Sequence, residues 1–526
     1  MKKILLWIFL PALTLSVATG CKKTMEELYV NPNKPTSVPP ALLFNGILND
    51  LYQAPYSNYE KYNQYYIINY DYYGNNRYDF GQGSNYYSTL KNVVKMEEEA
   101  RKIGLPELNA FSTMGKFFRA YFFTQMSLQL GDIPMTDAVK GANNLTPAYD
   151  AQKKVFQQAL LWLDTANTNL AALISTKDNN LQGDIYFKNN LSKWQKVVNT
   201  YKLRLLIHLS KKADDASLNI KQQFAQIVGN KTTFPLMQDM SDNLQYTYIS
   251  PTNLYPNNPG NFGFDALRYN TSATYVGLLT QLKDPRVFVT SEPATALVAA
   301  GKSPTGFDAF VGASPGEDLG SMYIKTNNGQ YSLLNRKHYY DTYTGEPSIQ
   351  IGYPEMLFNI AEAINRGWIT SGALGNAEDY YKAGIKASLT FYNIPESGTM
   401  PVYFLHPGAS LGNYDTYSVN VDFPAYYSQP MVKYAGEDNA AGLNEILTQR
   451  YLALFRHSGL ESYFTYRRTG VPAFTTGPGT GNSGRIAMRF KYSSSEQTAN
   501  TTNYQNALLS QYGGNDDINA MMWLLK

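Results

Sequence analysis

A short segment of this chain combines aromatic rings with amide and guanidinium groups. Between Asn69 and Tyr78 the sequence reads NYDYYGNNRY. A sugar ring has one apolar face and a rim of hydroxyl groups, so proteins bind it with flat aromatic surfaces flanked by hydrogen-bonding groups. The segment therefore predicts part of a glycan-binding site, with a loop that packs only on its own protein as the alternative. The candidate contact residues are Tyr72, Tyr73, Asn75, Asn76, Arg77 and Tyr78.

Two further groups of residues are secondary candidates for ligand contact. Arg268 and Tyr269 precede a predicted helix, and Tyr340 and Tyr343 belong, with Tyr339, to a predicted loop. Functional residues often lie on loops, but tyrosine rings also fill protein cores. For these residues we favour packing, or contact with a partner protein, over ligand binding.

The sequence offers little support for an enzyme. Gly312 to Gly316 fits the G-x-S-x-G pattern, but Pro315 would occupy the position whose backbone N–H binds the oxyanion, and proline has none. The histidines show no metal-ligand spacing; they are His208, His338, His406 and His457. We therefore predict no catalytic residue, no metal and no cofactor. A surface hydrolase with a pair of acids stays open, because the separation of carboxylates is a three-dimensional quantity.

Cys21 is the only cysteine of the 526 residues, and it follows a leader of the bacterial signal type. The leader has a basic start at Lys2 and Lys3, an apolar run to Leu15, and small residues directly before the cysteine. This order is similar to a lipobox and predicts that residues 1–20 are removed and Cys21 is acylated. Ordinary secretion with an incidental cysteine is the alternative. A disulfide within the chain is impossible.

Charge and composition restrict the partners. The net charge is +3, and removal of the two leader lysines lowers it to about +1, since 45 basic residues become 43 against 42 acidic ones. This balance gives no basis for nucleic-acid binding. Residues 21–40 are expected to form the lipidated N-terminus and a proline-rich tether, and residues 41–526 a single domain.

Hydrophobic periodicity predicts mainly helices. One helix begins with a capping-box pattern at Ser192 and Gln195, and another is apolar nearly all round and ends at Gly131. The predicted helices span residues 113–130, 152–170, 192–209, 354–366, 377–391 and 445–455. Small residues where these helices would cross suggest tetratricopeptide-like pairs. Long loops rich in tyrosine, asparagine and glycine are expected at residues 69–88, 241–272, 300–350 and 393–440.

Five motifs follow one another along the chain. They are Leu130 to Pro134 (LGDIP), Trp194 to Leu205 (WQKVVNTYKLRL), Leu282 to Arg286 (LKDPR), Pro354 to Gly367 (PEMLFNIAEAINRG), and QRYLALF at 449–455 followed by Glu461 and YRRTG at 466–470. In this order, and after a lipobox-like leader, they resemble the SusD/RagB family of outer-membrane lipoproteins from Bacteroidetes-type bacteria. The motifs are mainly structural and identify no ligand.

The resemblance implies a mostly α fold with four tetratricopeptide-like helix pairs and a loop-rich irregular half. It implies a non-catalytic, surface-exposed lipoprotein, held in the outer-membrane bilayer by acylated Cys21. Such a protein captures oligosaccharides and delivers them to a SusC-like, TonB-dependent outer-membrane channel, over which it sits as a lid. Two other readings of the fold are a peptide-binding member and a structural lid without ligand affinity of its own.

Overall fold

The computed structural model describes residues 37–526. The predicted signal peptide, Cys21 and the tether as far as residue 36 lie outside these residues. Within the described part, helices α3 to α22 accompany three two-stranded sheets, which confirms the predicted mostly α fold class. None of these helices is both long and apolar enough to cross a membrane.

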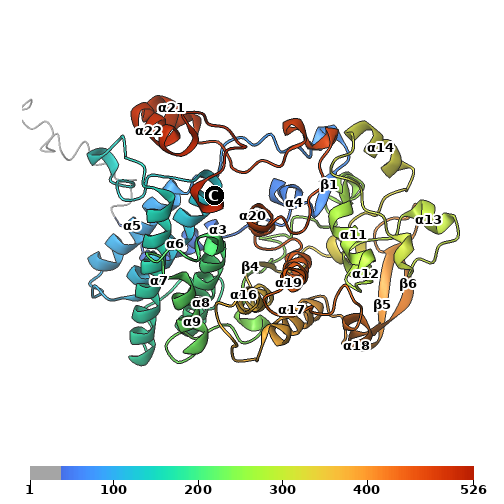
Figure 1. Cartoon of the computed structure of the whole chain (residues 1–526), viewed down its shortest axis with the longest axis horizontal. Coiled ribbons are helices and arrows are strands. Elements are labelled where there is room, and N and C mark those ends of the chain that lie inside the picture. The colour runs from blue at the N-terminus through green and yellow to red at the C-terminus, as the bar shows by residue number, and fades with distance from the viewer. Residues whose placement is uncertain (1–36) are drawn as a thin grey trace, which may run out of the picture.

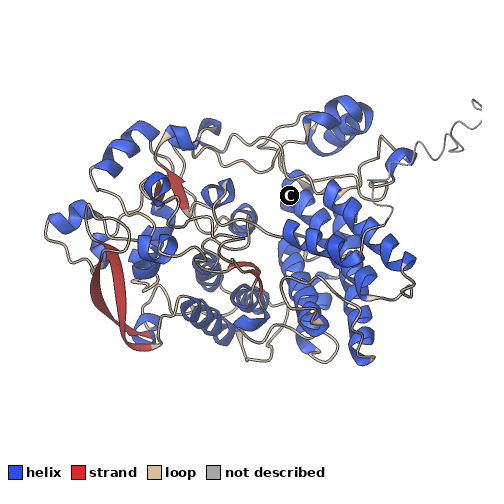
Figure 2. Ribbon diagram, turned by 180° about the vertical axis from the view of Figure 1, so that it is seen from behind, coloured by secondary structure: helices blue, strands red, loops and turns tan. Residues whose placement is uncertain are grey.

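Paired helices form the scaffold of the described chain. Helices α5 to α9 gather at one end of the molecule, and strands β5 and β6 lie at the opposite end (Figure 1), as the view from behind also shows (Figure 2). Among the helix pairs in contact are α3 (Pro40–Asp50) with α5 (Tyr87–Lys102), α6 (Ala110–Leu130) with α7 (Gln152–Ser175), α8 (Leu191–His208) with α9 (Ile220–Gly229), and α16 (Tyr353–Asn365) with α17 (Ala377–Phe391).

Local sequence explains most helix boundaries. Helix α17 has the predicted bounds, and α6 is buried on nearly all sides, as its apolar composition predicts. Several predicted bounds were wrong by a few residues, and two of the differences have a clear local cause. Helix α8 begins one residue earlier, because Asn190 rather than Ser192 caps it, accepting the Lys193 N–H at 3.1 Å. Pro40, assigned to the tether, is the first residue of α3. Proline suits this position, because the N–H that it lacks would have no partner within the helix.

The motif residues meet in buried ion pairs between helices. The Glu355 carboxylate of α16 accepts hydrogen bonds from Arg204 Nε of α8 at 2.8 Å and from Arg450 Nη2 of α19 (Ala440–Ala453) at 2.9 Å. Glu362 pairs with Arg468 of α20 (Glu461–Thr469) in the same way. Because an unpaired buried charge is costly, these bidentate pairs fix how the helices sit against one another. The motifs therefore hold the fold together, as the sequence suggested.

The segment 393–440, expected as a loop, contains the longest strands of the described chain. Strands β5 (Ser397–Leu405) and β6 (Tyr414–Asp422) pair antiparallel over their full length. Along β5, Met400, Val402 and Phe404 are buried, while the alternate residues Pro401 and Tyr403 are exposed. This period of two is a strand signal that the richness in tyrosine and glycine obscured.

Most of the remaining helices and strands are shorter than ten residues. They include α4 (Asn58–Tyr62), β1 (Tyr66–Ile68), η1 (Asp71–Tyr73), β2 (Leu244–Tyr246), α10 (Phe262–Asp265), β3 (Tyr269–Thr271), α11 (Ala273–Gln281), α12 (Val287–Thr290), α13 (Thr295–Ala299), α14 (Leu319–Asn327), α15 (Arg336–Tyr340), β4 (Ser348–Ile351), α18 (Phe423–Tyr427), α21 (Ser494–Ala499) and α22 (Thr501–Tyr512).

Candidate glycan-binding surface

Strand pairing brings two of the candidate segments together. Strands β1 and β3 run antiparallel, with Ile68 opposite Tyr269. Directly beyond them, the Asn69 N–H donates to the Arg268 carbonyl oxygen at 3.1 Å. Residues 69–78 and Arg268 therefore lie beside each other, although they are far apart in the sequence.

Four tyrosines and one arginine form a surface that we name the tyrosine platform. Its members are Tyr70, Tyr72, Tyr73, Arg268 and Tyr323. The rings of Tyr70 and Tyr323 stack with their centroids 5.3 Å apart, and the Tyr72 ring lies edge-on to Tyr73 at 5.4 Å. Tyr73 is fixed by its hydroxyl, which donates to the Phe264 carbonyl oxygen at 2.8 Å. The platform thus presents aromatic faces held by contacts among three separate segments.

The predicted contact residues of the 69–78 loop divide into two groups. Tyr72 is 83% exposed, and Asn75 and Arg77 are also exposed, so all three are available to a ligand. Asn75 Oδ1 accepts the Arg77 N–H at 3.0 Å, and Arg77 pairs with Asp79. Tyr73 is half-buried and belongs to the platform.

Asn76 and Tyr78 were wrongly assigned to the surface. The Asn76 amide bonds to both backbone groups of Ile68, at 2.9 and 2.7 Å, and so closes the loop on β1. Tyr78 is buried, and its hydroxyl donates to the Tyr62 carbonyl oxygen at 2.9 Å. Both side chains are used by the protein itself, because the loop folds back and alternate residues point inward.

The secondary candidates also separate by burial. Tyr269 is buried in β3, where its hydroxyl accepts from Tyr56, and Tyr340 is buried in α15, where its hydroxyl accepts from Asn257 Nδ2 at 3.1 Å. Tyr340 is thus helical rather than in a loop, and for these two the preference for packing agrees with the structure. Arg268 is half-buried in the platform, and Tyr343 is 43% exposed.

Sequence reasoning missed Tyr323 as a candidate. It lies on α14, a helix within the 300–350 segment that was expected to be a loop. Asp318 caps this helix by accepting the Ser321 N–H at 3.1 Å, so the capping residue was a signal available in the sequence. Tyr70 was within the quoted loop but was not selected as a contact residue.

A polar groove continues from the platform. It has a volume of about 370 Å³, and its lining includes Leu267, next to Arg268, and Thr326 and Asn327, one turn beyond Tyr323 on α14. Residues three and four apart share a helix face, so Tyr323 and these two residues lie on the same face of α14. Asn328, Tyr331 and Arg336 also line the groove and add hydrogen-bonding groups.

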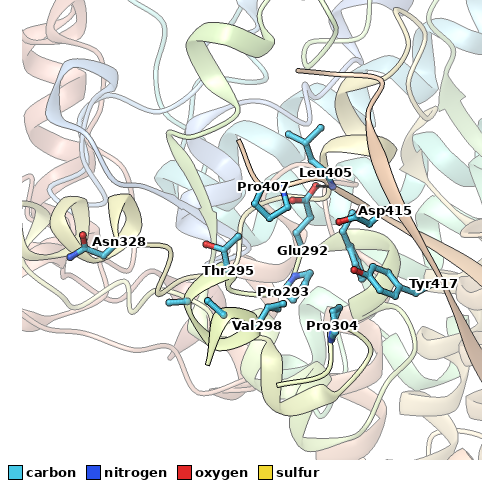
Figure 3. A pocket seen from close by; sticks show the side chains of 13 residues that line it. Glu292, Pro293, Thr295, Val298, Pro304, Asn328, Leu405, Pro407, Asp415 and Tyr417 are labelled. Carbon is cyan, nitrogen blue, oxygen red and sulfur yellow. Dashed lines mark hydrogen bonds between the residues drawn. The ribbon is translucent and has the colours of Figure 1, made fainter. Parts of the chain in front are cut away.

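A second, apolar pocket of about 440 Å³ adjoins the groove (Figure 3). It lies between α13 and the β5–β6 hairpin, and Val298, Pro304, Leu405 and Tyr417 are among its walls (Figure 3). Five residues line both cavities, so the two lie side by side; they are Glu292, Pro293, Thr295, Asn328 and Pro407. The platform, the groove and the pocket thus follow one another along the loop-rich end, through Leu267 and α14 and then through the shared wall.

Two ionisable groups beneath the platform respond to burial. Burial lowers the pKa of the Lys61 amine to about 8, while its Nζ donates to the Asn75 carbonyl oxygen at 2.7 Å. Burial also raises the pKa of the Asp265 carboxyl. In both cases burial disfavours the charged form of the side chain, which shifts its pKa. Within residues 37–526, no three His, Cys, Asp or Glu side chains come together as metal ligands.

These features define a mostly helical binding protein with an aromatic surface carried on its loops. The chain belongs to the SusD-like family, described as "Starch-binding associating with outer membrane", which matches residues 32–493. The predicted family is thus confirmed. Members of this family are binding proteins, so the chain is a binding protein associated with the outer membrane rather than an enzyme.

Solved structures agree with this assignment. A SusD homologue from Bacteroides fragilis is 31% identical, with a TM-score of 0.79 over 93% of this chain and 100% of its own. A second SusD homologue from the same species is 28% identical, with a TM-score of 0.76 over the same shares of the two chains. A chitin-binding SusD homologue from Flavobacterium johnsoniae shares the fold, at 19% identity and a TM-score of 0.68 over 93% of this chain and 98% of its own. None of the curated proteins compared with the chain matches it.

Proposed function

We propose that this protein is a lipid-anchored, cell-surface glycan-binding protein that captures oligosaccharides and delivers them to a SusC-like, TonB-dependent channel. The observation that supports glycan capture is the tyrosine platform, whose most exposed member, Tyr72, is 83% exposed. Exposing a large aromatic ring to water has no benefit for folding, whereas it suits stacking on the apolar face of a sugar.

The extended form of the surface supports a chain-like ligand. Stacking on the platform tolerates many sugars, and the amide groups of Asn327 and Asn328 in the groove can pair with hydroxyl groups farther along the chain. Lipid attachment at Cys21 would keep this surface near a channel, since several acyl chains on one residue anchor a protein firmly.

Glycan binding is tested by affinity electrophoresis of the mature chain, residues 22–526, through gels that contain plant, fungal or bacterial polysaccharides. We expect one polymer to retard the protein, and Tyr72→Ala to abolish most of that retardation. Ile185→Ala is the control, because Ile185 is an exposed apolar residue outside the platform. Retardation that is equal in wild type and Tyr72→Ala would contradict the platform.

Binding of peptide mixtures and of no polysaccharide would instead indicate the peptide-binding alternative. Delivery to a channel is tested separately, by purifying the lipoprotein from outer membranes and identifying what co-purifies. A TonB-dependent channel in stoichiometric amount is the expected partner, and its absence would contradict the delivery step without affecting glycan binding.

A further inference from the structure

The apolar pocket beside the groove has a lining unsuited to an unsubstituted sugar. Three prolines line it, together with Val298 and Phe404. The prolines are Pro293, Pro304 and Pro407. Sugar hydroxyls brought into such a place would lose their water partners, which costs free energy unless the protein replaces them.

The acidic side chains at the pocket already have partners. The Glu292 carboxylate accepts the Arg336 N–H at 2.8 Å and its Nε–H at 2.9 Å, and it also faces the Leu405 N–H at 3.4 Å. The Asp415 carboxylate lies 3.1 Å from His406 Nδ1. Glu292 is therefore used to hold α15 and β5 in place, and the lining that remains for a ligand is mostly apolar.

The size of the pocket selects among apolar groups. Its volume of about 440 Å³ falls in the range of roughly 300–1,000 Å³ that accommodates drug-sized ligands, so a two-carbon acetyl group would leave most of it empty. The Phe404 and Tyr417 rings in its wall have centroids 5.8 Å apart, at 35°. These rings and the faces of the prolines match a flat aromatic group.

We propose that the pocket receives an aromatic acyl group, esterified to a sugar of the glycan whose chain lies along the groove and the platform. The inference rests on the proposed function, because it requires a sugar chain along the platform and the groove. The five residues shared by groove and pocket place the acyl substituent beside that chain. The protein thus selects acylated glycans, because the platform contacts the sugar chain and the pocket binds its acyl substituent.

The first test uses methyl ferulate, a small aromatic ester, as the probe for the mature lipoprotein in ligand-detected NMR titrations. We expect saturable binding, about tenfold weaker in Val298→Arg, which places a charged side chain in the pocket. Ile185→Arg is the matched control and should bind as wild type, because Ile185 is exposed and outside the pocket. Tyr417→Ala, on the exposed hairpin, provides a second variant if Val298→Arg fails to fold.

The outcomes separate this inference from the proposed function. Tyr72→Ala should leave methyl ferulate binding unchanged, since Tyr72 lies on the platform, so failure of glycan capture would not affect this result. Absence of saturable binding, or equal binding by wild type and both pocket variants, overturns the inference. Tighter binding of N-acetyl-leucinamide than of methyl ferulate also overturns it, and would favour a peptide side chain as the occupant.

Discussion

The guanidinium carbon of Arg268 lies 4.7 Å from the ring centroid of Tyr70 and 5.8 Å from that of Tyr323. This single side chain therefore contacts both the 69–78 loop and α14, whose Tyr70 and Tyr323 rings also stack on each other. A cation near an aromatic face contributes about 0.5–1 kcal/mol at an exposed site. Arg268 thus stabilises the geometry of the platform rather than the whole fold.

Replacement of Arg268 should weaken glycan binding. We expect Arg268→Ala to reduce affinity by roughly threefold to fivefold, because the Tyr70 and Tyr323 rings lose the group that holds them. Arg268→Lys should retain part of the affinity, since it keeps the charge but not the planar group. Titration with the retarding polysaccharide measures both, and an unchanged affinity in Arg268→Ala would remove Arg268 from the site.

Tyr72 and Tyr78 provide a matched pair within one loop. Tyr72→Ala should leave thermal stability unchanged and lower glycan affinity by about fivefold or more, because its ring contacts mainly solvent. Tyr78→Ala should cost about 3–5 kcal/mol of unfolding free energy, the usual range for truncating a buried aromatic residue. Denaturant titrations and binding isotherms of both variants test whether Tyr72 contacts the ligand and Tyr78 belongs to the core. Lower stability in Tyr72→Ala, with lower affinity alone in Tyr78→Ala, would contradict this.

Stability should fall in acid because of Glu362. Burial alone would raise its pKa, but the guanidinium groups of Arg468 and Arg366 bring the pKa of this carboxyl from its ordinary 4.5 down to about 2. A depressed carboxyl pKa contributes stability above the unfolded pKa, here about 3 kcal/mol, that is lost as the pH falls from about 4.5 to about 2. Urea titrations across this range measure the loss.

Glu362→Gln is the corresponding variant. It should cost about 3–5 kcal/mol at neutral pH, because Arg468 is then buried without a charged partner, and it should reduce the acid dependence. Asp214→Asn is the control, since Asp214 forms an exposed pair with Lys221 and such pairs contribute at most about 1 kcal/mol. Equal stabilities of the two variants would contradict a structural role for Glu362.

Gly131 in the first motif is required for two separable reasons. Its φ is +94°, and a Cβ there would come within 2.2 Å of the Tyr512 hydroxyl. Gly104 has a similar φ of +86° but open space around it. We expect Gly104→Ala to lower the free energy of unfolding by about 1 kcal/mol and Gly131→Ala by about 3 kcal/mol or more. The difference between the two variants is the cost of the clash with Tyr512. Thermal melts of both variants test this order.

Cys21→Ser should release the protein from the membrane. The sequence predicts acylation at this residue, and a serine cannot form the thioether that carries the lipid. Fractionation of cells, with labelling by a radioactive fatty acid, should show the wild-type protein in the membrane and labelled, and the variant soluble and unlabelled. Labelled variant protein would place the lipid elsewhere.

The sequence by itself determined several of the long helices and the family. Helices α6 and α17 follow from apolar spacing, caps and a terminal glycine, because these signals act between residues within one or two turns of each other. The order of the motifs determined the family for a related reason. Their buried charges, such as Glu355 and Arg204, need specific partners. The charged residues therefore occur at fixed places in the motifs, and the motifs can be recognised in the sequence.

Only the tertiary structure decided which residues of the 69–78 loop are exposed and which are buried. Asn75 and Asn76 are neighbours of identical type, but the Asn76 amide is bound to the Ile68 backbone and the Asn75 side chain is exposed. The stacking of Tyr70 on Tyr323, and the apolar pocket between α13 and the hairpin, likewise join segments distant in the sequence. Exposure depends on what distant segments cover, so residue type and local spacing do not determine it.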